Sequence, residues 1–180
     1  MQVALDLGVD IINDIYSLQH KGAAEIVGQY DASVCLMHQN KQHHEVDRRL
    51  WHTSQDIFKE LFDFFEERLA ILGDLGLERE RFMLDPGIGF GKGCRDNLML
   101  LKNLDKLNVF DLPLLVGASR KTFIGEVLDK NVDARLFGGC AVTAYTFLRG
   151  AHIHRTHDIV ATKDTLLMLK AILEQDTKND

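Results

Sequence analysis

The chain has 180 residues, of which 46% are hydrophobic, so it can build one sizeable core and is too short for two comfortable domains. Its 27 acidic and 21 basic residues give a formal charge of -6, which argues against a general nucleic-acid binder, because such proteins carry a basic face. No apolar run approaches the roughly 20 residues that span a bilayer, and the first residues lack an export signal. We therefore expect a single domain over residues 1–180, without membrane contact, whose polar end (176–180) is flexible.

Three cysteines, Cys35, Cys94 and Cys140, are widely spaced and odd in number. Neither a disulfide framework nor a CxxC metal site fits this spacing. Free thiols are typical of a reducing compartment, so we expect a cytoplasmic protein.

Apolar periodicity predicts short strands that alternate with helices along the chain. The strand-like runs are VDIIND (9–14), SVCLMH (33–38), RFMLD (81–85), PLLVGAS (113–119) and AHIHRTH (151–157). The helical runs are ALDLG (4–8), GAAEIVGQY (22–30), a stretch over about 54–75, DNLMLLKNLDKL (96–107), KTFIGEVL (121–128), ARLFGGCAVTAYTFLRG (134–150) and ATKDTLLMLKAILEQ (161–175). The long helix carries one apolar stripe that we expect to be core: Ile57, Leu61, Phe64, Phe65, Leu69 and Leu72.

Strict alternation of this kind implies parallel strands joined by right-handed helical crossovers. Two architectures satisfy it, an α/β layered sheet and part of a (β/α)8 barrel. Periodicity does not separate them.

Each predicted strand ends in polar side chains that a structural loop would not need. They are Asn13 and Asp14, His38, Asp85, Ser119 with Arg120 and Lys121, and Arg155 with His157. The carboxyl ends of parallel strands share one face, where ligand sites are built from several strands at once. We therefore expect these residues to converge on one pocket.

Some of these residues also have a purely structural interpretation. Asn13 or Asp14 could cap the following helix, and Asp85 before a proline could be a turn residue. Arg155 and His157 lie two positions apart on one face of a strand, which favours anion binding over a solvated edge.

The glycine-rich loop LDPGIGFGK (84–92) fails two phosphate-binding patterns. The first glycine of a Walker loop is replaced by Pro86 and the final Ser or Thr by Gly93, and the spacing is not GxGxxG. We expect a mobile loop that allows close approach, in which Phe90 and Lys92 meet a flat or anionic ligand.

Five of the histidines fall into two groups, three that could bind a metal and two that lie in a predicted strand. His38, His43 and His44 lack a nearby Cys pair or an HExxH arrangement, so we interpret them as a polar loop. His152 and His154 should lie on the opposite strand face from Arg155, towards helices.

Taken together in this order, DIINDI, CLMH, LDPGIGFGK, LLVGASRKTFIG and GAHIHRTHD resemble the second part of bacterial dihydropteroate synthases, over about residues 1 to 175. The resemblance implies the TIM-barrel (β/α)8 fold family, here as an incomplete barrel of about five parallel strands with flanking helices. It implies a reaction of folate biosynthesis: dihydropterin pyrophosphate and p-aminobenzoate condense to dihydropteroate, with release of pyrophosphate and with Mg2+ as cofactor. It also implies a homodimer formed through the C-terminal helices.

The resemblance assigns roles residue by residue. The pterin-binding positions are Asn13, Met37, Asp85, Gly117 and Lys121. The positions against which p-aminobenzoate, or a sulfonamide in its place, packs are Phe90, Ser119 and Arg120, with Gly117 beside them. The pyrophosphate anchor is Arg155 with His157, and the catalytic set is Lys121, Arg155 and His157.

The sequence departs from the family at its front. The family's first three strands, its metal-binding asparagine, two closing loops and a pterin-contacting aspartate have no counterpart, so no metal ligand is expected in this chain. A five-strand arc should leave two unpaired edges and an open apolar inner face. The alternatives are therefore a catalytically weak or inactive homologue that binds pterin or pairs with another protomer, and, less well matched by GASRK and RxHD, a pterin-dependent methyltransferase.

A smaller departure is His154, where relatives carry an apolar residue. Burying an imidazole without partners costs on the order of 1–3 kcal/mol, so we expect local loosening there.

Overall fold

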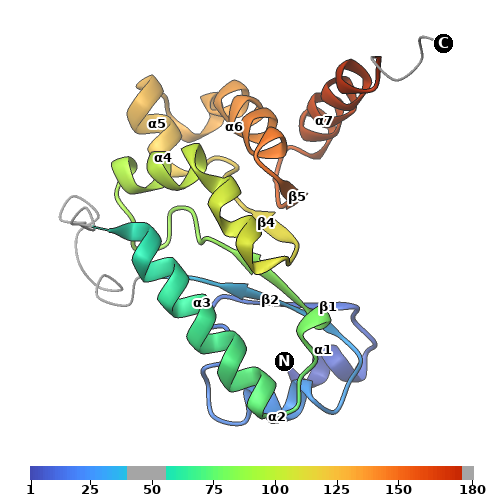
Figure 1. The fold of residues 1–180 in the computed structure, drawn as a ribbon. Coiled ribbons are helices and arrows are strands. Elements are labelled where there is room, and N and C mark those ends of the chain that lie inside the picture. The colour runs from blue at the N-terminus through green and yellow to red at the C-terminus, as the bar shows by residue number, and fades with distance from the viewer. Residues whose placement is uncertain (40–55, 176–180) are drawn as a thin grey trace.

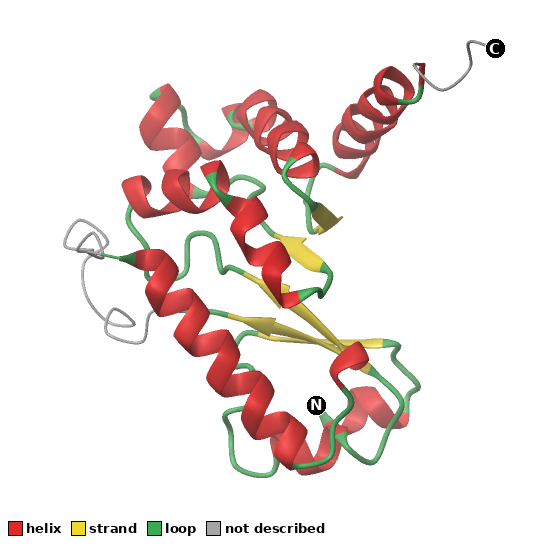
Figure 2. Ribbon diagram, in the orientation of Figure 1, coloured by secondary structure: helices red, strands yellow, loops and turns green. Residues whose placement is uncertain are grey.

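Five parallel strands form one sheet in the computed structural model, which describes residues 1–39 and 56–175 (Figures 1 and 2). The strands are β1 (Ile11–Asp14), β2 (Ser33–Met37), β3 (Phe82–Asp85), β4 (Leu114–Val116) and β5 (Ala151–His154). Their spatial order follows the chain, β1-β2-β3-β4-β5, and every pairing is parallel. A doubly wound sheet reverses its order at a switch point, whereas a (β/α) barrel does not. The strand order therefore matches a (β/α) barrel and not a doubly wound sheet. As expected, the barrel is incomplete, because β1 and β5 do not pair with each other.

Helices and short 3-10 turns connect the strands. They are α1 (Gln2–Asp6), α2 (Ala23–Val27), α3 (Ile57–Asp74), η3 (Arg79–Arg81), α4 (Cys94–Lys102), η4 (Leu104–Phe110), α5 (Thr122–Leu128), η5 (Val132–Ala134), α6 (Leu136–Leu148) and α7 (Ile159–Leu173). The predicted helix over 96–107 is therefore split, because α4 ends at Lys102 and a 3-10 segment follows. The start of the long helix at Ser54 and the tail over 176–180 lie outside the described residues.

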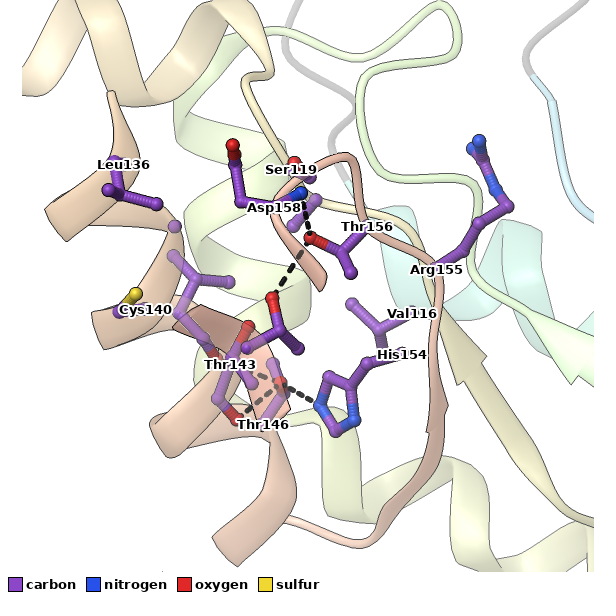
Figure 3. Close-up of a pocket in the computed structure, with 14 residues that line it drawn as sticks. Val116, Ser119, Leu136, Cys140, Thr143, Thr146, His154, Arg155, Thr156 and Asp158 are labelled. Carbon is purple, nitrogen blue, oxygen red and sulfur yellow. Dashed lines mark hydrogen bonds between the residues drawn. The ribbon is translucent and has the colours of Figure 1, made fainter. Parts of the chain in front are cut away.

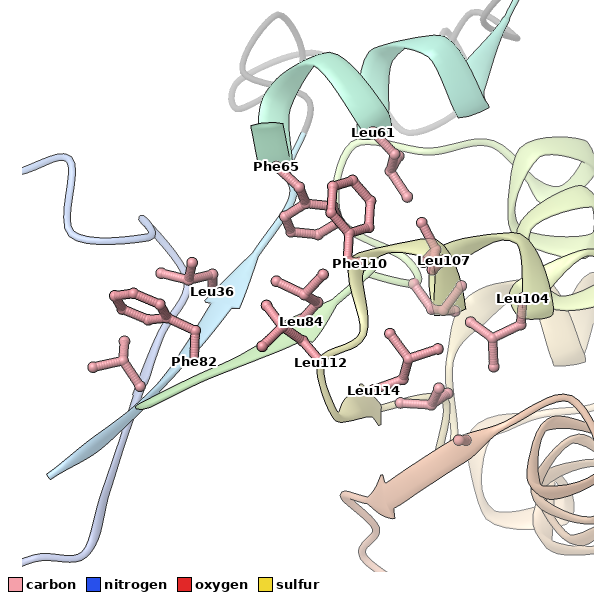
Figure 4. Packing of buried hydrophobic residues seen from close by; sticks show 14 of the residues in the cluster. Leu36, Leu61, Phe65, Phe82, Leu84, Leu104, Leu107, Phe110, Leu112 and Leu114 are labelled. Atoms are coloured by element: carbon pink, nitrogen blue, oxygen red, sulfur yellow. The ribbon is translucent and has the colours of Figure 1, made fainter. Parts of the chain in front are cut away.

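The main core lies between the sheet and the helices on one of its faces (Figure 4). Leu61 and Phe65 of α3 are fully buried and approach the outward-facing Leu36 and Leu84 of the strands. The Asp56 carboxylate caps α3 by accepting a hydrogen bond from Lys59 N at 3.0 Å. The predicted stripe of α3 is thus confirmed as core packing.

The other face of the sheet, which would line a barrel, carries a small apolar cluster. Cys35, Met83 and Leu115 are 0%, 7% and 6% exposed, and Ile153 packs against them. The expectation of a broadly open apolar inner face is therefore wrong for these positions, since the side chains of β2 to β5 cover one another. Ile11 on the edge strand β1 is the exception at 49% exposed.

A β-bulge shapes the fifth strand. Leu114 pairs with Ala151 but Leu115 pairs with Ile153, so His152 is the extra residue. Its Nδ1 accepts the Leu114 N–H at 3.2 Å, which replaces the missing ladder bond.

His154 is directed towards helix α6, as expected. Its Nε2 lies 3.0 Å from Thr146 Oγ1, and burial lowers the imidazole pKa. The expectation that this imidazole lacks a partner is wrong, because the Thr146 hydroxyl lies within hydrogen-bond distance of it.

None of the described helices is long and apolar enough to cross a bilayer.

Candidate functional site

Asp85 ends strand β3 and is 2% exposed. Its Oδ1 accepts the Gly87 N–H at 2.7 Å, a short local turn. Burial raises the pKa of this carboxyl from 3.8 to about 6, although the Gly87 N–H, Lys92, Arg155 and Lys121 all favour its charged form. A buried carboxylate at the end of a strand can accept the N–H donors of a ligand as charge-assisted hydrogen bonds.

The glycine loop after β3 is held by two residues of the same segment. Lys92 is 1% exposed, and its Nζ donates to the carbonyl oxygens of His38, Gly87 and Phe90 at 3.0, 3.0 and 3.3 Å. Burial lowers the pKa of Lys92 to about 7. The expectation that Lys92 meets an anionic ligand is wrong, because its three donors are directed at backbone oxygens.

Asn97, on helix α4, is the second residue that holds this loop. Its Oδ1 accepts the Gly89 N–H at 2.7 Å, and its Nδ2 donates to the carbonyl oxygens of Lys92 and Gly93 at 3.0 and 2.8 Å. These bonds tie the middle and the C-terminal end of the loop to helix α4, so the loop expected to be mobile is anchored. No sequence pattern marks an asparagine for this role.

Lys121 lies at the start of α5, against the glycine loop. Its Nζ stands 4.1 Å from the centroid of the Phe90 ring, a cation–π contact. A Cβ added at Gly89 would lie 3.0 Å from Lys121 Cδ, so glycine gives the lysine its room. Lys121 and Phe90, predicted to serve two different substrates, therefore form one unit.

Arg155 follows β5 directly and does not belong to it, because the strand ends at His154. Its N–H donates to Val116 O at 3.0 Å, and its guanidinium lies over Gly117. His157 is fixed by Ser119, whose Oγ accepts the His157 N–H at 3.2 Å and lies 3.0 Å from His157 Nδ1. The loops after β4 and β5 thus meet side by side.

Gly117→Ala should weaken anion binding without unfolding the chain. A Cβ there would lie 2.9 Å from Arg155 Nη2, the far end of a flexible side chain that can move aside. We expect pyrophosphate affinity, measured by calorimetry, to fall roughly 3- to 10-fold because the guanidinium is displaced. Gly139→Ala on α6, where a Cβ meets nothing within 4 Å, is the control, and equal affinities of the two variants would contradict the prediction.

Arg120 lines the cleft but is also paired with the carboxylate of Asp158. Its guanidinium donates to both carboxylate oxygens of Asp158, Nε to Oδ2 at 3.1 Å and Nη2 to Oδ1 at 2.5 Å. The ion pair lowers the pKa of Asp158 and raises that of Arg120. A contact of Arg120 with p-aminobenzoate stays a prediction, and any such contact must share the guanidinium with Asp158.

An open cleft joins most of the predicted positions. Its lining includes Phe90, Gly117, Ser119, Arg120, Lys121, Arg155 and His157. It carries more cationic than anionic side chains, which suits an anionic ligand. Asn13, Met37 and Asp85 are outside this lining, although Asp85 is close enough to Arg155 and Lys121 for their charges to affect its pKa.

Asn13 and Met37 lie near the ends of strands β1 and β2. Met37 is 2% exposed and pairs in register with Asp85, while Asn13 pairs with Cys35 on exposed strand β1. The carboxylate of Asp14 accepts the N–H groups of Tyr16 and Leu18 at 3.1 and 2.7 Å, so Asp14 is a turn residue.

His38 is not part of a solvated loop. It is 6% exposed, packs edge-on against Phe64 with ring centroids 5.1 Å apart, and has a pKa lowered to about 3 by burial and by Lys92. The polar-loop interpretation is therefore wrong for His38, while His43 and His44 lie outside the described residues. Within residues 1–39 and 56–175, no three His, Cys, Asp or Glu side chains form a group that could hold a metal ion.

The ionisation of Asp85 gives a pH prediction. Its pKa is raised from 3.8 to about 6, so between these pH values the folded chain keeps a proton that the unfolded chain has lost. The contribution of Asp85 to the free energy of unfolding therefore falls as pH rises from 3.8 to about 6. A ligand that donates N–H groups needs the ionised form, so we expect pterin affinity to rise between about pH 5 and about pH 7 and then level off. Fluorescence titration across this range tests it; the same profile in Asp85→Asn would contradict it.

Comparison with known proteins gives one consistent result. The family model described as pterin binding enzyme matches residues 1–157. Dihydropteroate synthase of Escherichia coli (strain K12) is 38% identical over 167 residues, which cover 93% of this chain and 58% of that protein. The chain thus spans somewhat over half the length of this curated relative.

Two solved structures show the same fold. Dihydropteroate synthase of Xanthomonas albilineans in complex with 7,8-dihydropteroate has a TM-score of 0.88 at 33% identity, covering 96% of this chain and 64% of the other. Dihydropteroate synthase of Yersinia pestis with a sulfonamide drug complex has a TM-score of 0.87 at 32% identity, covering 95% and 62%. In both comparisons more than a third of the solved chain has no counterpart here.

Proposed function

We propose, from the premise that this chain belongs to the pterin binding enzyme family, that it takes part in the dihydropteroate synthase reaction of folate biosynthesis. The observation that carries the proposal is the buried carboxylate of Asp85 beside a cleft lined by Lys121, Arg155 and His157. The Asp85 carboxylate suits a flat heterocycle with N–H donors, and the cationic cleft suits a diphosphate.

In the pterin half, Asp85 accepts a fork of N–H groups from the pterin edge as a charge-assisted pair. Asn13, which has both a donor and an acceptor, completes the recognition of that edge, and Met37 and Gly117 give the ring its surface. Lys121 reaches the ring system from the side of Phe90.

In the anion half, Arg155 and His157 hold the diphosphate oxygens. The bond between the pterin methylene carbon and the diphosphate oxygen breaks, and the electron pair leaves with pyrophosphate, whose growing charge these prepositioned donors stabilise. The p-aminobenzoate amine, packed against Phe90 and Ser119, then forms the carbon–nitrogen bond to the pterin cation and loses a proton. No covalent enzyme nucleophile is needed.

Mg2+ is the cofactor that the resemblance implies, and it would neutralise diphosphate charge. The described residues do not form a protein cage for it, since no three His, Cys, Asp or Glu side chains come together among them.

The proposal includes a cytoplasmic homodimer that forms through the last two helices. Large apolar side chains on α6 and α7 support it, because Phe137, Ile159 and Val160 are 84%, 69% and 74% exposed. Sedimentation at two concentrations tests the dimer, and a monomer at both would contradict it.

The reaction is tested by mixing the chain with dihydropterin pyrophosphate, p-aminobenzoate and Mg2+ and quantifying dihydropteroate by chromatography. Product formed in proportion to the chain, and lost in Asp85→Asn, supports the proposed function. Binding of pterin without product would instead support the alternative, a catalytically weak homologue.

A further inference from the structure

The segment that carries the anion-binding residues alternates between two sets of contacts, and Figure 3 shows Arg155 directed away from Thr156 and Asp158. Arg155 and His157 line the cleft, whereas Thr156 and Asp158 contact neighbouring elements of the fold. We propose that Asp158 and Thr156 are positioning residues, which hold this segment from two sides so that Arg155 and His157 present their donors at the spacing a diphosphate needs. This inference rests on the proposed function.

From one side, the loop after β4 holds Asp158. The bidentate pair with Arg120 is only partly exposed, with side chains 39% and 20% accessible. A bidentate pair fixes both distance and orientation, which a single contact does not. Because Asp158 directly follows His157, and His157 is bonded to Ser119 next to Arg120, the two loops are joined at two adjacent positions.

Arg120 is itself held in place. Its backbone adopts a left-handed conformation, with φ of 57°, that costs a non-glycine residue energy. Arg135, at the start of α6, donates from Nη1 to the Arg120 carbonyl oxygen at 3.0 Å. An unfavourable backbone conformation fixed from outside directs the Arg120 side chain towards Asp158.

From the other side, helix α7 holds Thr156. Thr162 is 8% exposed, and its hydroxyl donates to Thr156 Oγ1 at 2.9 Å. Thr156 Oγ1 in turn accepts the Asp158 N–H at 3.1 Å. Thr156 and Thr162 line a pocket that residues of α6, of α7 and of the segments after β4 and β5 form, and Figure 3 gives a close-up of it.

The two contacts act on different atoms of one short segment. Arg120 fixes the Asp158 side chain, and Thr162 acts through Thr156 on the Asp158 backbone. Catalytic and binding groups work best when their supporting contacts lock them near the productive geometry. Loss of either contact should therefore loosen Arg155 and His157 and leave Asp85 unaffected.

The test measures two ligands on each variant of the 180-residue chain by calorimetry: inorganic pyrophosphate and a dihydropterin without a diphosphate. We expect Asp158→Asn and Thr162→Val each to weaken pyrophosphate binding roughly 5-fold, with dihydropterin affinity unchanged within about 2-fold. Asp164→Asn, on the exposed part of α7, is the matched control for the lost charge.

A double-mutant cycle separates positioning from general loosening. In a His157→Ala background, Asp158→Asn should have a clearly smaller effect on pyrophosphate affinity, because the group it positions is gone. Undiminished effects in that background, or equal losses for both ligands, would overturn the inference. Unchanged pyrophosphate affinity in Asp158→Asn would contradict this inference alone, whereas an unmodified chain that binds neither ligand would contradict the proposed function and the inference with it.

Discussion

Asp85→Asn should reduce pterin affinity by at least about 100-fold, since two charge-assisted hydrogen bonds of about 1.5–3 kcal/mol each depend on the carboxylate. Asparagine has the same shape and its oxygen can still accept the Gly87 N–H, so the turn should survive. Its amide group, however, would place N–H donors against the N–H donors of the pterin. Fluorescence titration with a dihydropterin at about pH 7.5, above the pKa of about 6, gives the affinities.

Asp96→Asn is the matched control for this prediction. Asp96 is as buried as Asp85, at 2% exposed, but it lies on helix α4, whereas Asp85 ends strand β3. We expect Asp96→Asn to keep pterin affinity within about 3-fold. If both variants lost binding equally, buried carboxylates would be acting on stability, and Asp85 would not be the pterin acceptor.

Gly87→Ala should be among the most destabilising substitutions in the chain. Gly87 has φ of +67°, and a Cβ added there would lie 1.8 Å from the carbonyl oxygen of His38, a backbone atom that cannot move aside. The same movement would break the Lys92 bonds to His38 and Gly87. We expect the free energy of unfolding to fall by more than about 3 kcal/mol, measured by urea denaturation.

Gly76→Ala separates the steric clash from the cost of the backbone conformation. Gly76 also has a positive φ, +81°, but a Cβ there meets nothing within 4 Å. The free energy of unfolding of Gly76→Ala should therefore fall by only about 1 kcal/mol, the cost of the left-handed conformation alone. Similar unfolding free energies for the two variants would show that the glycine loop does not need this close approach.

Much of the architecture could be predicted from apolar periodicity. Each of the five strands was expected within a few residues of where it lies, because buried parallel strands consist of short apolar runs bounded by polar or turn residues. Periodicity could not choose between barrel and layered sheet, since the spatial order of strands depends on contacts far apart in sequence. The 3-10 segment after Lys102 was also missed, because its leucines continue the helical spacing.

The positions of the site residues could be predicted from the sequence, but the role of each residue could not. Polar residues at strand ends can be located from sequence, so Asp85, Ser119, Arg155 and His157 were singled out. Whether a polar group serves a ligand or the backbone depends on burial and on unpaired backbone oxygens, which sequence does not contain. Lys92 is the clearest example, since three carbonyl oxygens from separate residues surround its ammonium group.

The most direct test of the account is a crossed calorimetric titration of the unmodified chain, Asp85→Asn and Arg155→Ala, each with a dihydropterin and with pyrophosphate. We predict that the unmodified chain binds both, that Asp85→Asn loses only the dihydropterin, and that Arg155→Ala loses only pyrophosphate. A folded unmodified chain that binds neither ligand, or variants that lose both together, would contradict the claim that these residues form a two-part site for a pterin and a diphosphate.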